Sequence, residues 1–328
     1  MLTICIPTYN RPDKVRQRII ELLPQLSEFV KILIIDNASV EPVVDIIGDL
    51  ITGIDKVKVV RNKYNIGMSA NIARCIEYAD TDWLWILGDD DLVTSFAVDR
   101  IKADIAAADE DVCCLKYSSY CNENSHDEVL NIKEFLSHKA MGFDYVSNIF
   151  LISSSIIKIK NISALDKMMD TINSMVPHVV LIFQLLINGG RISFIKNKIV
   201  EKTDSDISWS IMQLEFNLKL APQFATNVDN ETFRLVKSFF CNHITFSPAS
   251  IFLRAHKMSK SKSREYICYL YSGIVLQSFF SKYGFLKFGS HAFLYFLFQL
   301  HVDKFLPVFF RLAGMRFHLK YNKFMTES

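Results

Sequence analysis

Three consecutive aspartates that follow an apolar stretch are the strongest chemical signal in the chain. Residues 83–87 are apolar or aromatic and predict a buried strand, which Gly88 joins to Asp89, Asp90 and Asp91. Adjacent carboxylates repel one another and raise one another's pKa unless a cation lies among them. Hard oxygen ligands without Cys or His favour Mg²⁺ or Mn²⁺, which usually keep substrate phosphates as further ligands. The stretch therefore predicts a divalent metal site, with a solvated acidic turn as the ordinary alternative.

Composition and charge indicate a folded chain with two parts of opposite net charge. Half of the 328 residues are apolar and glycine and proline are few, which excludes a disordered protein. Residues 254–328 carry 12 Lys and Arg against 3 Asp and Glu, a net charge of +9, so residues 1–253 carry −7. The seven cysteines are scattered without a CxxC pair, and no basic region precedes the first apolar run. These features predict a reduced, cytosolic compartment and no signal peptide.

Strand and helix patterns alternate along the first hundred residues. Strands are expected at 2–6, 31–35, 57–60 and 83–87, with helices at 12–26 and 69–78 between them. This alternation predicts an α/β fold with a mostly parallel sheet, in which ligands bind outside the carboxyl ends of the strands. Each polar cluster taken singly is ordinary turn chemistry, but together they predict one nucleotide and metal cleft. The cleft would be lined by Thr8, Asp36, Asn37, Asn65 and the three aspartates.

The motifs at these strand ends resemble those of a known family. The order and spacing of residues 7–11, 36–39, 61–67 and 88–91 are similar to those of family-2 glycosyltransferases of the bacterial surface-polysaccharide, or O-antigen, type. The resemblance implies a GT-A fold over about residues 1–214, a nucleotide-sugar donor and inversion at the anomeric carbon. It also implies that Asp90 and Asp91 hold Mn²⁺ or Mg²⁺. By position, the nucleotide would contact Pro7, Thr8, Tyr9, Asn10, Arg11, Asp36, Asn37, Asn65, Gly67, Arg74 and Asp89.

Asn37 departs from the family pattern. Many relatives have an acidic residue at this position, which accepts a hydrogen bond from uracil. An asparagine side chain can donate as well as accept. The nucleotide of the donor is therefore left open between UDP, CDP and another nucleoside diphosphate.

The general base implied by the resemblance falls on a histidine. Residues 176–192 predict a helix with Pro177 in its first turn and a glycine stop. Relatives commonly have an aspartate base at the start of this helix, where this chain has His178. An imidazole with a pKa of about 6 to 7 is suited to accept a proton near neutral pH. The alternative for His178 is a capping or core role, in which case Asp144 and Asp170 become the next candidates for the base.

From residue 215 onward the pattern becomes helical, aromatic and basic. The longest uncharged runs, 266–281 and 288–302, are 16 and 15 residues long, whereas a membrane-spanning helix needs about 20. Apolar helices with Lys and Arg are typical of interfacial membrane contact. A helical subdomain, packed on the catalytic domain or on a second copy of the chain, is the alternative for residues 215–328.

Together these features predict a metal-dependent inverting glycosyltransferase. It would lie on the inner face of the cell membrane and extend a lipid-linked oligosaccharide during surface-polysaccharide biosynthesis. Nucleic acid is not expected as a partner, and homo-oligomerisation is left open. The rival hypotheses are a non-catalytic nucleotide-binding scaffold and a sugar-nucleotide pyrophosphorylase, whose glycine-rich first loop this chain lacks.

Overall fold

A mixed β-sheet forms the centre of the computed structural model. The structure describes residues 1–119, 123–124, 126–137, 148–160, 165–170, 172, 176–201, 225 and 228–242. The helices expected beyond residue 254 and the candidate base Asp144 lie outside these residues. Within these residues the eight strands of this sheet have the order β3-β2-β1-β4-β8-β6-β9-β7.

The first four strands are parallel, as the alternating pattern predicts. They are β1 (Leu2–Thr8), β2 (Val30–Asp36), β3 (Val57–Arg61) and β4 (Trp83–Ile86). In this register Thr8 lies opposite Asp36, and Asp36 lies opposite Arg61. The polar residues at the strand ends therefore meet at one edge of the sheet.

The other half of the sheet mixes both strand directions. β8 (Ser155–Lys158) is antiparallel to β4 and to β6 (Val112–Ser118), while β9 (Arg191–Lys198) is parallel to β6. β7 (Glu128–Leu130) closes this edge. β5 (Leu92–Val93) and β10 (Val200–Glu201) form a small separate ladder directly after the three aspartates.

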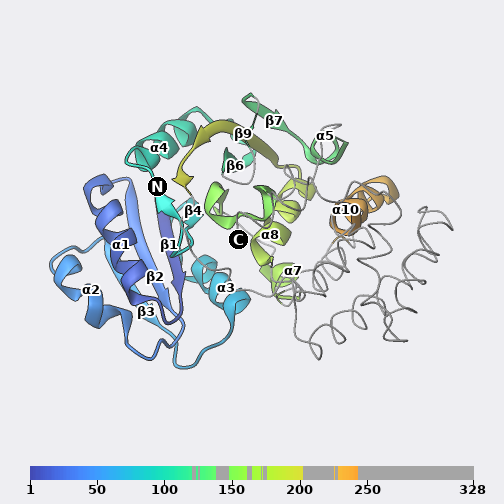
Figure 1. Cartoon of the computed structure of the whole chain (residues 1–328). Coiled ribbons are helices and arrows are strands. Elements are labelled where there is room, and N and C mark those ends of the chain that lie inside the picture. Colours follow the sequence, from blue (N-terminus) through green and yellow to red (C-terminus); the bar gives the residue numbers. More distant parts are fainter. Residues whose placement is uncertain are drawn as a thin grey trace, which may run out of the picture. The chain divides into compact units, whose positions relative to one another are not determined.

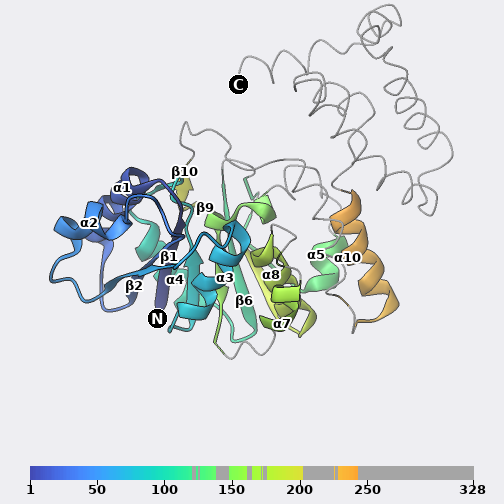
Figure 2. The same ribbon diagram turned by 90° about the horizontal axis from the view of Figure 1, so that it is seen from below.

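Helices cover both faces of the sheet (Figures 1 and 2). α1 (Pro12–Leu22), α2 (Val43–Ile51) and α4 (Ala97–Ala107) pack on one face; α3 (Met68–Tyr78) and α8 (Pro177–Ile187) lie on the other. Alternate residues of a strand point to opposite faces, so the apolar strands supply both cores. The other described helices are the short η1 (Leu23–Gln25), α5 (Ile132–Ser137), η2 (Ile152–Ser154) and α7 (Leu165–Asp170), and the longer α10 (Asn230–Asn242).

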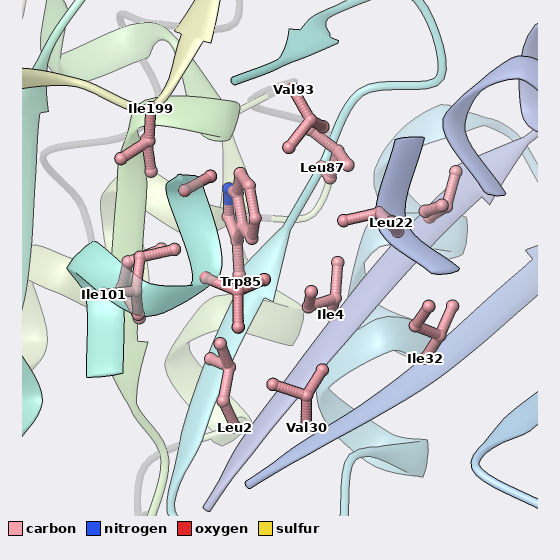
Figure 3. Packing of buried hydrophobic residues seen from close by; sticks show 14 of the residues in the cluster. Leu2, Ile4, Leu22, Val30, Ile32, Trp85, Leu87, Val93, Ile101 and Ile199 are labelled. Carbon is pink, nitrogen blue, oxygen red and sulfur yellow. The ribbon is translucent and has the colours of Figure 1, made fainter. Parts of the chain in front are cut away.

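The core under α1 and α4 anchors the end of β4. The indole of Trp85 is fully buried between Ile4 of β1 and Ile101 of α4 (Figure 3). Leu22 of α1 and Leu87, which follows β4, extend the same cluster. Because such interiors are packed as tightly as organic crystals, the residues that follow Leu87 start from a fixed position.

α10 falls inside the segment 215–328 and packs on the rest of the described chain. The ring centroid of Phe239 lies 4.9 Å from that of Phe183 in α8 and 5.6 Å from that of Phe135 in α5. The boundary after residue 214 stays a prediction. Within the described residues, no helix is both long and apolar enough to span a bilayer.

Candidate functional site

The ends of β1 and β4 bring four of the predicted residues into direct contact. Thr8 Oγ1 donates a hydrogen bond of 2.7 Å to Asp89 Oδ2. Arg11 Nη1 lies 2.8 Å from Asp89 Oδ1 and 3.3 Å from Asp90 Oδ2. The parallel pairing of β1 with β4 explains these contacts between residues about eighty positions apart.

The sequence predicts a cation among the aspartates, and the structure places the guanidinium of Arg11 there. Asp89 is only 6 % exposed, and burial raises its pKa, with a further increase from Asp90. Thr8 and Arg11 act in the opposite direction because they stabilise the carboxylate. Burial works against the charge of Arg11, but the two aspartates raise its pKa above the ordinary value.

A second arginine, Arg18, contacts the acidic turn, which is formed by residues 88–91. Arg18 of α1 is 1 % exposed and donates to the backbone carbonyl of Asp91 and to Glu21, at 2.8 Å for the latter. Glu21 also accepts the backbone N–H of Val93, at 3.1 Å. Burial lowers the pKa of Arg18, and the neighbouring carboxylates partly offset this effect. The turn is thus held at one end by the ion pairs of Arg11 and at the other by the hydrogen bond from Arg18 to the Asp91 carbonyl.

Gly88 marks a small cradle of oxygen atoms. A Cβ at this position would lie 2.9 Å from Asp91 Oδ2 and 3.2 Å from both Asp90 Oδ1 and Ser153 Oγ. Ser153 Oγ also accepts the backbone N–H of Gly88, at 2.8 Å. These hard oxygens match the donor preference of Mg²⁺ and Mn²⁺, so Asp90 and Asp91 fit the expected role. Among the residues that the structure describes, however, no three His, Cys, Asp or Glu side chains form a complete metal cluster.

The loops after β1 and β2 each contain a residue with an unusual backbone conformation, and hydrogen bonds of Asn10 join the two loops. Asn10 and Ala38 have φ values of 55° and 62°, in the left-handed region that few non-glycine residues occupy. The backbone N–H of Asn10 donates to Ser39 Oγ, and the N–H of Val40 donates to Asn10 Oδ1, both at 2.8 Å. Such conformations persist only where surrounding contacts hold them, and they occur often at functional sites.

Asp36 is occupied by its own loop. Its carboxylate accepts the N–H of Ser39 at 2.9 Å and that of Val43 at 3.4 Å, and it pairs with Arg61. Burial raises its pKa, but these hydrogen bonds dominate and the pKa is lowered overall. In this structure Asp36 therefore fixes the backbone of the loop that follows β2.

Asn37 is saturated with hydrogen bonds. Its Nδ2 donates to Asn65 Oδ1 at 2.8 Å and to the Gly67 carbonyl at 3.4 Å. Its Oδ1 accepts from Asn62 Nδ2 and from the Ile66 N–H, both at 3.0 Å. The network thus brings three predicted residues together, and Asn37 would have to give up a bond to contact a base.

The remaining predicted nucleotide contacts are placed less centrally. Pro7 lies near the end of β1, and Tyr9 is 43 % exposed. Arg74 interacts with Glu77 and Tyr78 of its own helix. Contact between Arg74 and a nucleotide stays a prediction.

His178 is buried at the start of α8, where its chemistry differs from the expected one. Its Nε2 lies 3.1 Å from the carbonyl of Phe150 and must be the protonated nitrogen, because a carbonyl can only accept. Nδ1 has no hydrogen-bond partner among the described residues. The expected pKa of about 6 to 7 is wrong here: burial first, and then the charge of Lys116, lower the pKa to about 3. His178 is therefore neutral near pH 7, but it is a weak base.

The segment 150–155 connects the acidic turn to His178. The carbonyl of Phe150 accepts a hydrogen bond from His178. Ser153 Oγ accepts one from the N–H of Gly88, and the carbonyl of Ser153 accepts one from the indole N–H of Trp85, at 2.8 Å. The fully buried Lys116 donates to the Leu151 carbonyl and to the hydroxyls of Ser154 and Ser155. These contacts accompany the 3₁₀ turn η2 (Ile152–Ser154), which directly precedes β8.

Comparisons with known proteins agree with this geometry. Residues 3–157 match the model of glycosyl transferase family 2. No curated protein sequence matches the chain. A crystal structure of TarS 1-349 from S. aureus, in complex with UDP-GlcNAc, is similar with a TM-score of 0.61 and 15 % identity, over 82 % of this chain and 79 % of that one. The mannosyltransferase PcManGT from Pyrobaculum calidifontis, in complex with GDP-Man and Mn²⁺, has a TM-score of 0.50 and 12 % identity, over 89 % of this chain and 84 % of that one.

The central mixed α/β sheet of the described residues has the GT-A fold, which the similar structures share. Residues 3–157 match glycosyl transferase family 2, and this match supports a glycosyltransferase as the class of enzyme. This identification favours the enzyme over the scaffold and pyrophosphorylase hypotheses.

Proposed function

We propose that this chain is a metal-dependent inverting glycosyltransferase that extends a lipid-linked oligosaccharide of a bacterial surface polysaccharide, such as an O-antigen. The observation that carries the proposal is the contact of Thr8 and Arg11 with Asp89 and Asp90, beside the oxygen cradle at Gly88. A catalytic domain of residues 1–214 would bind the donor, and residues 215–328 would contact the membrane on its cytoplasmic face.

The strand-end loops would hold the nucleotide. The tied loops after β1 and β2 give Tyr9 and Asn10 fixed positions, and the Asn37 network fixes the loop 62–67. Because Asn37 is saturated, we propose that the base is read by other groups of these loops. UDP, CDP and GDP sugars all stay candidate donors, and the similar structures contain UDP-GlcNAc and GDP-Man.

The acidic turn would help to neutralise the charge of the departing diphosphate. Asp90 and Asp91 would hold Mn²⁺ or Mg²⁺, which neutralises negative charge on a leaving nucleoside diphosphate. Arg11 lies 3.3 Å from the carboxylate of Asp90, and it would add to this neutralisation.

His178 would accept the proton of the acceptor hydroxyl. Its Nε2–H is fixed on the carbonyl of Phe150, so the lone pair needed for proton transfer lies on Nδ1. Its low pKa keeps the imidazole neutral at neutral pH but also makes it a weak base, so proton transfer would have to accompany the in-line attack. Inverting transfer then needs only in-line attack and no covalent intermediate.

A nucleotide-binding panel tests the donor site. UDP, CDP and GDP are titrated into the protein with and without Mn²⁺, and melting temperatures are recorded, since a ligand that binds only the folded state stabilises it. We expect one nucleotide to raise the melting temperature more with Mn²⁺ than without. Asp90→Ala should lose the Mn²⁺-dependent part, and Asp55→Ala, an exposed carboxylate before β3, should not. Equal shifts with and without Mn²⁺ would remove the metal from the proposal.

A vesicle assay tests the acceptor side. The basic residues that interrupt the apolar tail should bind anionic headgroups, and salt should weaken this binding. Replacing these five residues by Gln should release the full-length chain from anionic vesicles: Lys282, Lys287, Lys304, Arg311 and Arg316. Unchanged binding would favour the packed-subdomain alternative.

A further inference from the structure

Arg11 and the oxygen cradle contact opposite oxygens of one carboxylate. The Oδ2 atom of Asp90 lies 3.3 Å from Arg11 Nη1, whereas its Oδ1 atom lies beside Gly88, near Asp91 Oδ2. Arg11 also lies 2.8 Å from Asp89, which Thr8 orients. A divalent ion in the cradle would therefore share Asp90 with a guanidinium that is already in place.

From this geometry we propose that Arg11 makes divalent-metal binding conditional on the diphosphate of the donor. This inference rests on the proposed function. In the donor-free protein the guanidinium already neutralises Asp89 and Asp90 and repels a second cation on the same carboxylate. A diphosphate supplies negative charge to both cations, so the metal and the nucleotide bind cooperatively.

The local environment makes this repulsion strong. The side chain of Arg11 is only 26 % exposed and that of Asp89 only 7 %, so water screens the charges incompletely. Neutralising Arg11 should then tighten binding of Mn²⁺ alone by roughly tenfold to a hundredfold, at 1.4 kcal/mol for each factor of ten.

Arg11→Gln provides the test, because the amide can still donate to Asp89 while the charge is lost. The Mn²⁺ dissociation constant is measured by electron paramagnetic resonance, with and without UDP. We expect Arg11→Gln to bind Mn²⁺ alone about ten times more tightly than wild type or better, and UDP to improve that affinity less than in wild type. Mn²⁺ alone should also raise the melting temperature of the variant more than that of wild type.

Two controls separate the local charge from other effects. Arg11→Lys retains the positive charge and should retain weak binding of Mn²⁺ alone. Arg16→Met removes the same charge from α1, where Arg16 pairs with Asp49 instead, and should leave both affinities unchanged.

The outcomes distinguish this inference from the proposed function. If Arg11→Gln and wild type bind Mn²⁺ alone equally, and both bind Mn²⁺ more tightly with UDP, the role of Arg11 is overturned while the metal site stands. If no protein binds Mn²⁺, either alone or with any of UDP, CDP and GDP, the metal part of the proposed function fails together with this inference.

Discussion

At the end of β4 the buried carboxylate of Asp89 receives hydrogen bonds from Thr8 and Arg11. At the start of α8 the equally buried imidazole of His178 has one hydrogen-bond partner among the described residues, the carbonyl of Phe150. The first group lies beside an opposite charge, whereas the second lies near the positive charge of Lys116. The two regions are only one short segment apart, yet their electrostatic environments are opposite.

This difference shows how one edge of a sheet can serve two kinds of chemistry. A carboxylate that has a cation and a hydroxyl beside it can stay ionised despite burial, and can act on other charges. An imidazole without an opposite charge gives up its proton and stays neutral, the form in which it can accept one. The acidic turn is therefore suited to a charged donor, and the surroundings of His178 to a neutral hydroxyl.

The largest expected effect on activity comes from the charged region, which comprises Thr8, Arg11, Asp89 and Asp90. Asp90→Ala removes the carboxylate that Arg11 and the cradle share, and should lower transfer by about 10³-fold or more. The folded state should be retained, because the substitution also removes repulsion from Asp89. Transfer rate and melting temperature are measured together, with Asp55→Ala as control. Wild-type transfer by Asp90→Ala, or full wild-type activity in EDTA, would show that the acidic turn does not carry the chemistry.

The next largest effect on activity comes from the neutral region, which comprises His178 with its neighbours Phe150 and Lys116. His178→Gln can still donate to the carbonyl of Phe150 but removes the ring lone pair, and should lower kcat by about 10²-fold with little change in the donor KM. Because the pKa of His178 is about 3, its protonation should produce no fall in kcat between pH 6 and 7. Near-wild-type kcat in this variant would exclude His178 as the base and direct the search to Asp170 and Asp144.

The pH dependence of stability gives a third test, independent of activity. The pKa of His178 is about 3 in the folded protein and about 6.5 when unfolded, so the unfolded chain binds the extra proton between these values. Stability is then fully present above pH 6.5 and is lost as the pH falls, by up to about 1.4 kcal/mol per pH unit for this one group. His178→Gln should lose less stability than wild type between pH 7 and 5 in urea unfolding. Parallel losses would mean that the imidazole is solvated and that the contrast between the regions is false.

Much of the charged region could be predicted from the sequence, because its residues follow parallel strands. The strand order and register then bring Thr8 and Asp89 together whatever the details of the loops. The identity of the cation between Asp89 and Asp90 could not be predicted, since it depends on the rotamer of Arg11 and on the path of the loop after β1.

The neutral region was harder to predict, because its properties come from contacts far apart in the sequence. The low pKa of His178 depends on burial by α8 and on Lys116, a lysine within an apolar strand. The three consecutive serines 153–155 were the available signal for the connecting turn. Their hydroxyls prefer local hydrogen bonds to extended structure, but the sequence alone does not show which partners they find.

The smallest expected effect tests whether η2 physically joins the two regions. Ser153→Ala removes the acceptor of the Gly88 N–H and should destabilise the fold by about 1 to 2 kcal/mol, the usual cost of an unpaired buried donor. It should also weaken Mn²⁺-dependent nucleotide binding several-fold, because Ser153 Oγ is part of the cradle. Ser155→Ala is the matched control: its hydroxyl accepts from Lys116 at 2.7 Å, so its loss should cost stability alone. If both variants weaken nucleotide binding equally, the cradle oxygen has no special role, and the acidic turn and His178 are coupled only through general packing.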